Sequence, residues 1–177
     1  MSKPEVDIDV DPETGIWRTD GLPMLYLPRH FFVNNHVAVE EALGLEAYRT
    51  ILRTATDKSA VHWCKSVAKT LNLSPVDTFH RYFKRLSQRG WGQFEVAALD
   101  VAGQSGCINL RNSIFVLEQH DKPASRAVCY MFEGFMTGAL RYLIDAESTA
   151  MQIDCRESHC AAMGHAHCQF EFGTDLT

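Results

Sequence analysis

The chain has 177 residues, of which 46% are hydrophobic and 22% charged, and its net charge is −5. This length fits one domain with a sizeable core, and an acidic balance argues against a direct nucleic-acid partner. No apolar run approaches the roughly 20 residues of a membrane span, and the acidic N-terminus lacks the pattern of a secretory signal, so we expect a cytoplasmic protein.

The N-terminal half is expected to be mainly helical. Residues 1–15 are rich in Asp, Glu and Pro and should form a disordered or extended arm ahead of a single domain, residues 16–177. Residues 17–27 are apolar but contain Gly and Pro, which favours an extended arm or edge strand. Apolar residues then recur at helical spacing over the ranges 31–43, 46–55 and 57–71. A further helix should begin with Ser74 as its N-cap and Pro75 at its first position, and end at Gly90.

The C-terminal half alternates between strand and helix patterns. Residues 91–100 and 107–117 show period-two alternation around a glycine-containing turn, which predicts an antiparallel hairpin. Residues 125–145 form the most apolar predicted helix, in which Gly134 and Gly138 let another backbone or a ligand approach closely. Residues 150–155 and 167–172 predict two short strands. The order predicts an α+β domain with helices on one face of an antiparallel sheet of about four strands.

Metal-binding residue types concentrate between residues 155 and 168. In a reducing cytosol such a group favours metal binding or catalysis over disulfides. A zinc ion takes four nitrogen, sulfur or oxygen donors in a tetrahedron, and Gly164 allows the chain between the donors to turn back. The candidate donors in this stretch are Cys155, Glu157, His159, Cys160, His165, His167 and Cys168.

Two motifs resemble a known family. The stretch from Glu157 through Cys160, Gly164 and Cys168 to Phe170 is similar to the C-terminal signature of the 4-vinyl reductase domain family. The helix pattern Cys129, Gly134, Gly138 resembles the helix before that signature in the family's aromatic-sensing members. The resemblance implies a small-molecule-binding fold, shared with proteins of nitric-oxide signalling and Golgi transport.

The resemblance also implies a zinc site made by Cys129, Glu157, Cys160 and Cys168. From the residues alone, Glu157 and Cys160 are three apart and can face one ion from a tight turn. A longer connection than in the sensors separates Cys129 from Glu157, so Cys155 is the rival fourth ligand. Four protein donors would make a closed, structural site with no open position for water.

A pocket between the helices and the sheet is a further implication of the resemblance. Hydrophobic and aromatic residues of the hairpin and the long helix are expected to line it, together with a few polar groups that orient the ligand. The candidates are Trp91, Phe94, Ile108, Leu110, Phe115, Phe132, Phe135, Met136 and Tyr142, with the polar residues His62, His80, Tyr82 and Asn112.

These observations favour a non-enzymatic, zinc-stabilised protein that binds a hydrophobic or aromatic ligand. It would act as a sensor or carrier through a partner, as a homodimer. No glycine-rich nucleotide motif supports catalysis. Two alternatives follow from the resemblance: an accessory of tetrapyrrole biosynthesis or vinyl reduction, and a dimeric interaction module that binds an acyl chain.

Overall fold

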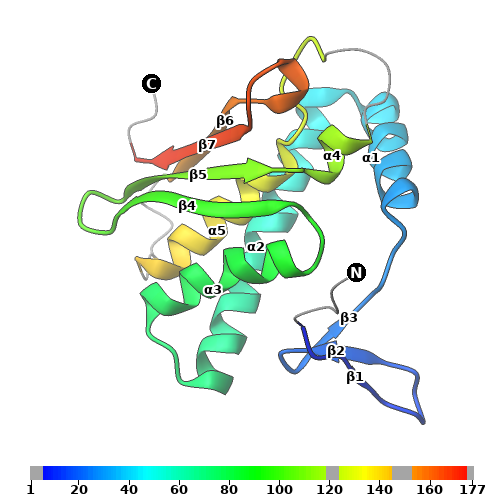
Figure 1. Ribbon diagram of the computed structural model, residues 1–177, viewed down its shortest axis with the longest axis vertical. Helices are drawn as coiled ribbons and strands as arrows, with labels where there is room; N and C mark the ends of the chain where they lie inside the picture. Colours follow the sequence, from blue (N-terminus) through cyan, green and yellow to red (C-terminus); the bar gives the residue numbers. More distant parts are fainter. Residues whose placement is uncertain (1–5, 119–123, 145–152, 175–177) are drawn as a thin grey trace.

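The computed structural model describes residues 6–118, 124–144 and 153–174 (Figure 1). The C-terminal half contains a four-stranded antiparallel sheet, which we call the main sheet. Its strand order is β4-β5-β7-β6, and all three neighbouring pairs are antiparallel. The predicted α+β class and sheet are confirmed. The strands are β4 (Gln93–Asp100), β5 (Ser105–Arg111), β6 (Asp154–His159) and β7 (Cys168–Gly173).

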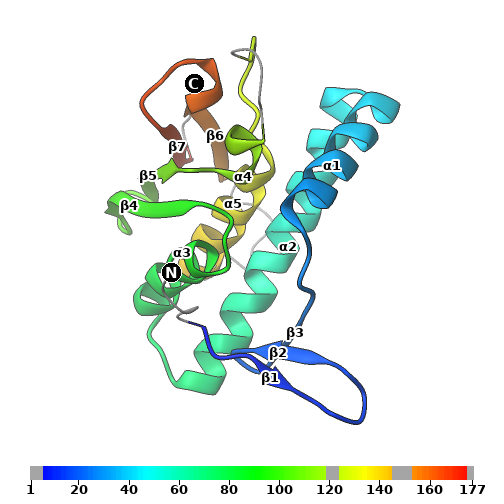
Figure 2. The same ribbon diagram turned by 45° about the vertical axis from the view of Figure 1, so that its right-hand side comes forward.

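Helices cover one face of the main sheet (Figure 2). The helix α5 (Met131–Leu143) lies between the sheet and the long helix α2 (Leu45–Leu71), while α3 (Pro75–Gln88) packs against β4. Every second side chain of β7 points to the same face of the sheet, and Cys168, Phe170 and Phe172 on that face are all buried. The helices cover this apolar face. The remaining helices are α1 (Arg29–Leu43), the single turn α4 (Ile114–Leu117) and a short 3-10 helix, η1 (Ala161–Met163).

The backbones of α2 and α5 approach closely at the two glycines that the sequence singled out. A Cβ atom on Gly138 would lie 2.4 Å from the carbonyl oxygen of Asp57. One on Gly134 would lie 2.1 Å from the hydroxyl of Thr56. The predicted close approach is therefore confirmed, and α2 is the element that makes it.

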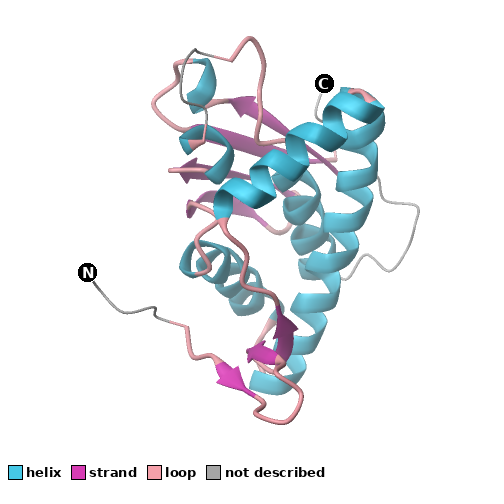
Figure 3. Ribbon diagram, turned by 90° about the vertical axis from the view of Figure 1, so that its right-hand side faces the viewer, coloured by secondary structure: helices cyan, strands magenta, loops and turns pink. Residues whose placement is uncertain are grey.

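A second, three-stranded sheet precedes the helices, and we call it the N-terminal sheet. It consists of β1 (Asp9–Val10), β2 (Trp17–Thr19) and β3 (Leu22–Met24), paired antiparallel in that order. It lies apart from the main sheet, beyond the start of α1 (Figure 3). Asp20 and Gly21 form its β2–β3 turn, both with positive φ.

Several predicted boundaries need correction. The helices expected at 46–55 and 57–71 are one continuous helix, because no residue between them breaks the backbone. The strand expected at 107–117 ends at Arg111, where Asn112 takes a left-handed conformation before α4. The helix expected from residue 125 begins only at Met131. Asp145 and residues 150–152 of a predicted strand lie outside the described residues.

The fourth predicted helix is confirmed in detail at its N-terminus. The Ser74 hydroxyl accepts a hydrogen bond from the Asp77 backbone N–H at 3.1 Å, and Pro75 occupies the first turn. Among the described residues, no helix is both long enough and apolar enough to cross a membrane.

Candidate metal centre and ligand cavity

Four potential metal donors converge where the main sheet meets the loop before α5. Cys129 precedes α5, Glu157 lies on β6, Cys160 follows that strand and Cys168 begins β7. One donor atom from each lies within 4.8 Å of the others. The Sγ atoms of Cys129 and Cys168 are 3.7 Å apart. Tetrahedral zinc with Zn–S bonds of 2.3 Å would place two sulfurs about 3.8 Å apart, so this spacing fits.

Backbone hydrogen bonds hold the donors in place. The Cys129 N–H donates to Glu157 Oε2 at 2.8 Å, and the Ala161 N–H donates to the Cys168 Sγ at 3.3 Å. The loop between Cys160 and Cys168 reverses direction at Gly164, whose φ of 95° suits glycine. These backbone hydrogen bonds and the turn at Gly164 therefore orient the donors without the help of a bound ion.

Burial shapes the electrostatics of this group. It raises the pKa of Glu157 to about 9 and raises the pKa of the Cys129 thiol well above its usual value. The pKa of Cys160 is lowered, because the thiols of Cys129 and Cys168 donate hydrogen bonds to its thiolate. A dication would favour deprotonation of all the donors.

An orphaned buried atom also points to a metal. Among the described residues, Glu157 Oε1 is buried and has no hydrogen-bond partner. A carboxylate oxygen left unpaired inside a protein is costly unless a cation or water satisfies it. Three cysteines and a carboxylate form a donor set suited to zinc, so the residues fit this ion.

The rival donors lie elsewhere. Cys155 is buried and its Sγ lies 3.8 Å from the Met136 Sδ, outside the group of four. His159 and His165 are exposed and contact each other edge to face, with ring centroids 4.8 Å apart. His167 is half-buried and is also outside the group.

Sequence reasoning missed a buried ion pair beside the metal group. Glu133, on α5, is fully buried and accepts two hydrogen bonds from Arg49 of α2, at 2.6 and 3.0 Å. Its Oε1 also accepts the backbone N–H of Glu157 at 3.1 Å. The pair therefore fixes the strand that carries one donor. The one sequence feature that could have predicted this ion pair is the position of Glu133, an acidic residue within the apolar pattern of α5.

Most of the predicted pocket residues lie in the core. Phe132 is an aromatic centre, with ring centroids 5.2 Å from Phe94 and 5.5 Å from Phe115. The fully or almost fully buried members are Tyr82, Ile108, Leu110, Phe115, Phe132 and Met136, and the partly buried ones are Trp91, Phe94, Phe135 and Tyr142. A ligand-binding role for these residues stays a prediction.

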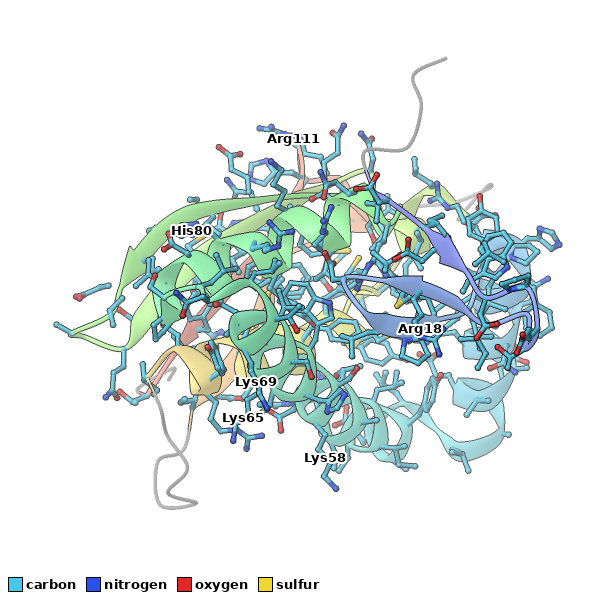
Figure 4. The ribbon with its side chains drawn as sticks, turned by 90° about the horizontal axis from the view of Figure 1, so that it is seen from below. Arg18, Lys58, Lys65, Lys69, His80 and Arg111 are labelled. Atoms are coloured by element: carbon cyan, nitrogen blue, oxygen red, sulfur yellow. The ribbon has the colours of Figure 1, made fainter. Side chains whose placement is uncertain are left out.

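Three of the polar residues predicted to orient a ligand lie at the surface. His62 and Asn112 are exposed, and the Asn112 amide donates to Gln93 at 3.0 Å. His80 is exposed at the surface of α3 (Figure 4), where it lines an open groove together with Phe94. Their roles in binding also stay predictions.

A cavity of about 510 Å³ lies between the N-terminal sheet and the body of the domain. Of the predicted pocket residues, only Trp91 lines it. Its volume is in the range of small-molecule sites. The lining is mostly apolar and comprises Val6, Ile8, Trp17, Thr19, Met24, Leu25, Tyr26, Leu27, Arg29, Phe32, Gln88, Arg89, Gly90, Trp91 and Ile114.

A known family model matches the N-terminal half of the chain. The family model for a domain of unknown function, DUF5943, matches residues 2–97, more than half of the chain. The chain belongs to the DUF5943 family. The match includes the N-terminal sheet and α1 to α3 but none of the four metal-donor residues. No curated protein matches this DUF5943 chain.

Solved structures share the fold of this DUF5943 protein at low sequence identity. The phenol-responsive sensory domain of the transcription activator PoxR, solved with phenol, has a TM-score of 0.77 and 19% identity, over 94% of this chain and 84% of that one. A trafficking protein particle complex subunit 3 from Naegleria fowleri, covalently bound to palmitic acid, has a TM-score of 0.56 and 13% identity, over 84% and 95%.

The third structure bears on the resemblance seen in the sequence. It is a vinyl-4-reductase family protein from Methanocaldococcus jannaschii, with a TM-score of 0.54 and 13% identity, over 86% of this chain and 85% of that one. These likenesses confirm the predicted fold, while the family model that matches the sequence is DUF5943.

Proposed function

We propose that this protein is a non-enzymatic small-molecule-binding domain that acts as a sensor or carrier through a partner. The observation that carries the proposal is the largely apolar cavity of about 510 Å³ between the N-terminal sheet and the domain body. Such cavities suit ligands that are mainly hydrophobic. Two solved relatives in fold hold phenol and palmitic acid, which supports a binding role.

Native mass spectrometry of the protein, purified without added ligand, tests this function. We expect a trapped small molecule, or saturable binding of simple aromatic compounds with a rise in melting temperature. Filling the cavity with Met24→Trp should abolish that binding, whereas Val76→Trp at an exposed site outside it should not. Binding that survives Met24→Trp would contradict this location.

A zinc ion held by Cys129, Glu157, Cys160 and Cys168 would stabilise the domain. Bound there, it would supply a structural cross-link between β6, β7 and the loop before α5, with no open coordination position for chemistry. The buried, convergent donors and the unpaired Glu157 Oε1 support this proposal.

Metal analysis of the purified protein tests the zinc site. We expect one zinc per chain, and a melting temperature that falls when a chelator removes it. Cys160→Ser should lose the metal, whereas Cys155→Ser, a matched change at a buried cysteine outside the group, should retain it. If Cys155→Ser loses the zinc, Cys155 and not Cys129 is the fourth ligand, and the proposed donor set is wrong.

An acyl-chain-binding module is the second candidate function. The fold shared with a palmitic-acid-bound trafficking subunit supports it, and the fold shared with a vinyl-4-reductase family protein supports the tetrapyrrole alternative in the same way. Lipid extraction and mass spectrometry of the same purified sample would separate an acyl chain from an aromatic ligand.

A further inference from the structure

Three arginines of α3 and its C-terminal end converge on one aspartate of the N-terminal sheet. Arg81, Arg85 and Arg89 are spaced four apart and therefore share a helix face. Asp20, in the β2–β3 turn, accepts hydrogen bonds from all three, at 3.4, 2.8 and 3.3 Å for the Nη2 atoms. Its side chain is 6% exposed. Of this cluster, Arg89 also lines the cavity.

The cluster carries more positive than negative charge. One carboxylate faces three guanidinium groups, and the Nε atoms of Arg81 and Arg89 are buried without a hydrogen-bond partner among the described residues. Burial lowers the pKa of Arg89, which shows that its charge is poorly solvated. An additional anion beside Arg89 would therefore be favourable.

Only Arg89 of the three lines the cavity, and the second charged residue of the described lining is also an arginine. This residue is Arg29, whose side chain is 43% exposed and whose Nε is 3.8 Å from Glu118. None of the lining residues within the described part of the chain is acidic, although the chain as a whole has a net charge of −5. An apolar wall with cations and no acids selects for a negatively charged amphiphile.

We propose that the cavity binds an apolar molecule that bears a carboxylate, with the carboxylate at Arg89. This inference rests on the ligand-binding function proposed above and names its ligand class. The guanidinium fork of Arg89 donates to the carboxylate, and the apolar part lies against Trp17, Phe32 and Trp91. Arg29 contributes less, because its exposed charge is screened by water.

A matched pair of probes tests the head group. 4-Phenylbutyrate and 4-phenylbutanol share the same apolar part, and their binding to the full chain can be measured by calorimetry and by tryptophan fluorescence, since Trp17 and Trp91 line the cavity. We expect the acid to bind roughly ten- to a hundredfold more tightly than the alcohol, as expected for a hydrogen bond to a charged group.

Two arginine variants locate the effect. Arg89→Gln should reduce the preference for the acid to near unity, whereas Arg81→Gln, which also contacts Asp20 but does not line the cavity, should retain it. Circular dichroism checks that both variants fold. Should Arg89→Gln fail to fold, the comparison of the two probes on the unaltered protein still decides the head-group preference.

The outcomes separate the two proposals. Equal affinity for the acid and the alcohol, or equal loss of preference in the Arg81 and Arg89 variants, would overturn the carboxylate assignment and leave the ligand-binding function standing. Tighter binding of the alcohol would overturn it as well. If neither probe nor any neutral aromatic compound binds, the ligand-binding function itself is contradicted.

Discussion

Glu133 places an acidic side chain inside the helical layer, where it accepts hydrogen bonds from the Arg49 guanidinium and from the Glu157 backbone N–H. A buried charge of this kind is costly as soon as one partner is removed. Because Glu157 is also a proposed metal donor, the pair affects both the stability of the fold and the position of the donor.

Glu133→Gln should therefore destabilise the protein by about 3 kcal/mol, because Arg49 loses its charged partner. Urea denaturation of the metal-loaded protein measures this free energy. The matched control is Glu95→Gln, in a surface pair with Arg111 whose side chains are 60% and 59% exposed. There we expect a change below about 0.5 kcal/mol. Similar losses in both variants would contradict a special role for Glu133.

His36 makes stability depend on pH. Its ring is buried against Tyr48, Phe115 and Tyr130, Nδ1 has no hydrogen-bond partner among the described residues, and burial lowers its pKa to about 4. The unfolded chain binds this proton near pH 6.5, so the stabilisation is complete above that pH and is lost as the pH falls towards 4.

Between pH 7 and 4.5 we expect His36 to account for about 2 kcal/mol of lost unfolding free energy. His36→Gln should remove this part of the pH dependence, although the variant is less stable at every pH. His62→Gln, at an exposed histidine, should leave the dependence unchanged. Parallel pH curves for the unaltered protein and His36→Gln would refute the assignment.

At the scale of elements, the contact between α2 and α5 depends on glycine. Gly138→Ala would place a Cβ atom against the Asp57 carbonyl and the Ala60 side chain, so the helices must move apart. We expect a loss of about 2 kcal/mol despite the better helix propensity of alanine. Thr137→Ala, which removes only a hydroxyl bonded within the same helix, should cost less than about 1 kcal/mol.

Local patterns predicted the parts of this fold that depend on neighbouring residues. The Ser74 cap, the hairpin of β4 and β5 and the close approach at Gly134 follow from residues near one another in the sequence. The start of α5 did not, because residues before Met131 are apolar yet form the loop that brings Cys129 to the donor group. An apolar pattern alone cannot distinguish a buried helix from a buried loop.

The candidate sites show the same division. The grouping of Glu157, Cys160 and Cys168 could be anticipated, because all three lie in one short stretch. The cavity could not, since residues far apart in the sequence line it, among them Trp17 and Met24 of the N-terminal sheet and Gln88 of α3. Only the tertiary structure brings such groups together.

At the scale of the whole molecule, three of the exposed apolar side chains lie close together in the sequence, around the segment that joins β3 to α1. Leu25 and Tyr26 are 83% and 84% exposed, and Phe31 on α1 is 56% exposed. Exposed apolar groups of this size are typical of interaction surfaces. They support the proposal that the protein forms a homodimer through the segment that joins β3 to α1.

Tyr26→Asp should therefore shift the protein from dimer to monomer by at least tenfold in dissociation constant, because burying an unpaired carboxylate opposes association. Analytical ultracentrifugation measures the change. Val101→Asp, in the β4–β5 turn, alters another exposed apolar residue and should leave the dimer intact. A monomeric unaltered protein, or dissociation caused equally by both changes, would contradict this interface.

The position of β7 has a consequence for synthesis. This strand, near the C-terminal end of the chain, lies between β5 and β6 and also carries Cys168. A chain still on the ribosome, with β7 inside the exit tunnel, therefore presents an unpaired β5 edge and an incomplete donor group. The main sheet and the group of four candidate donors therefore become complete in the same step, when β7 pairs between β5 and β6.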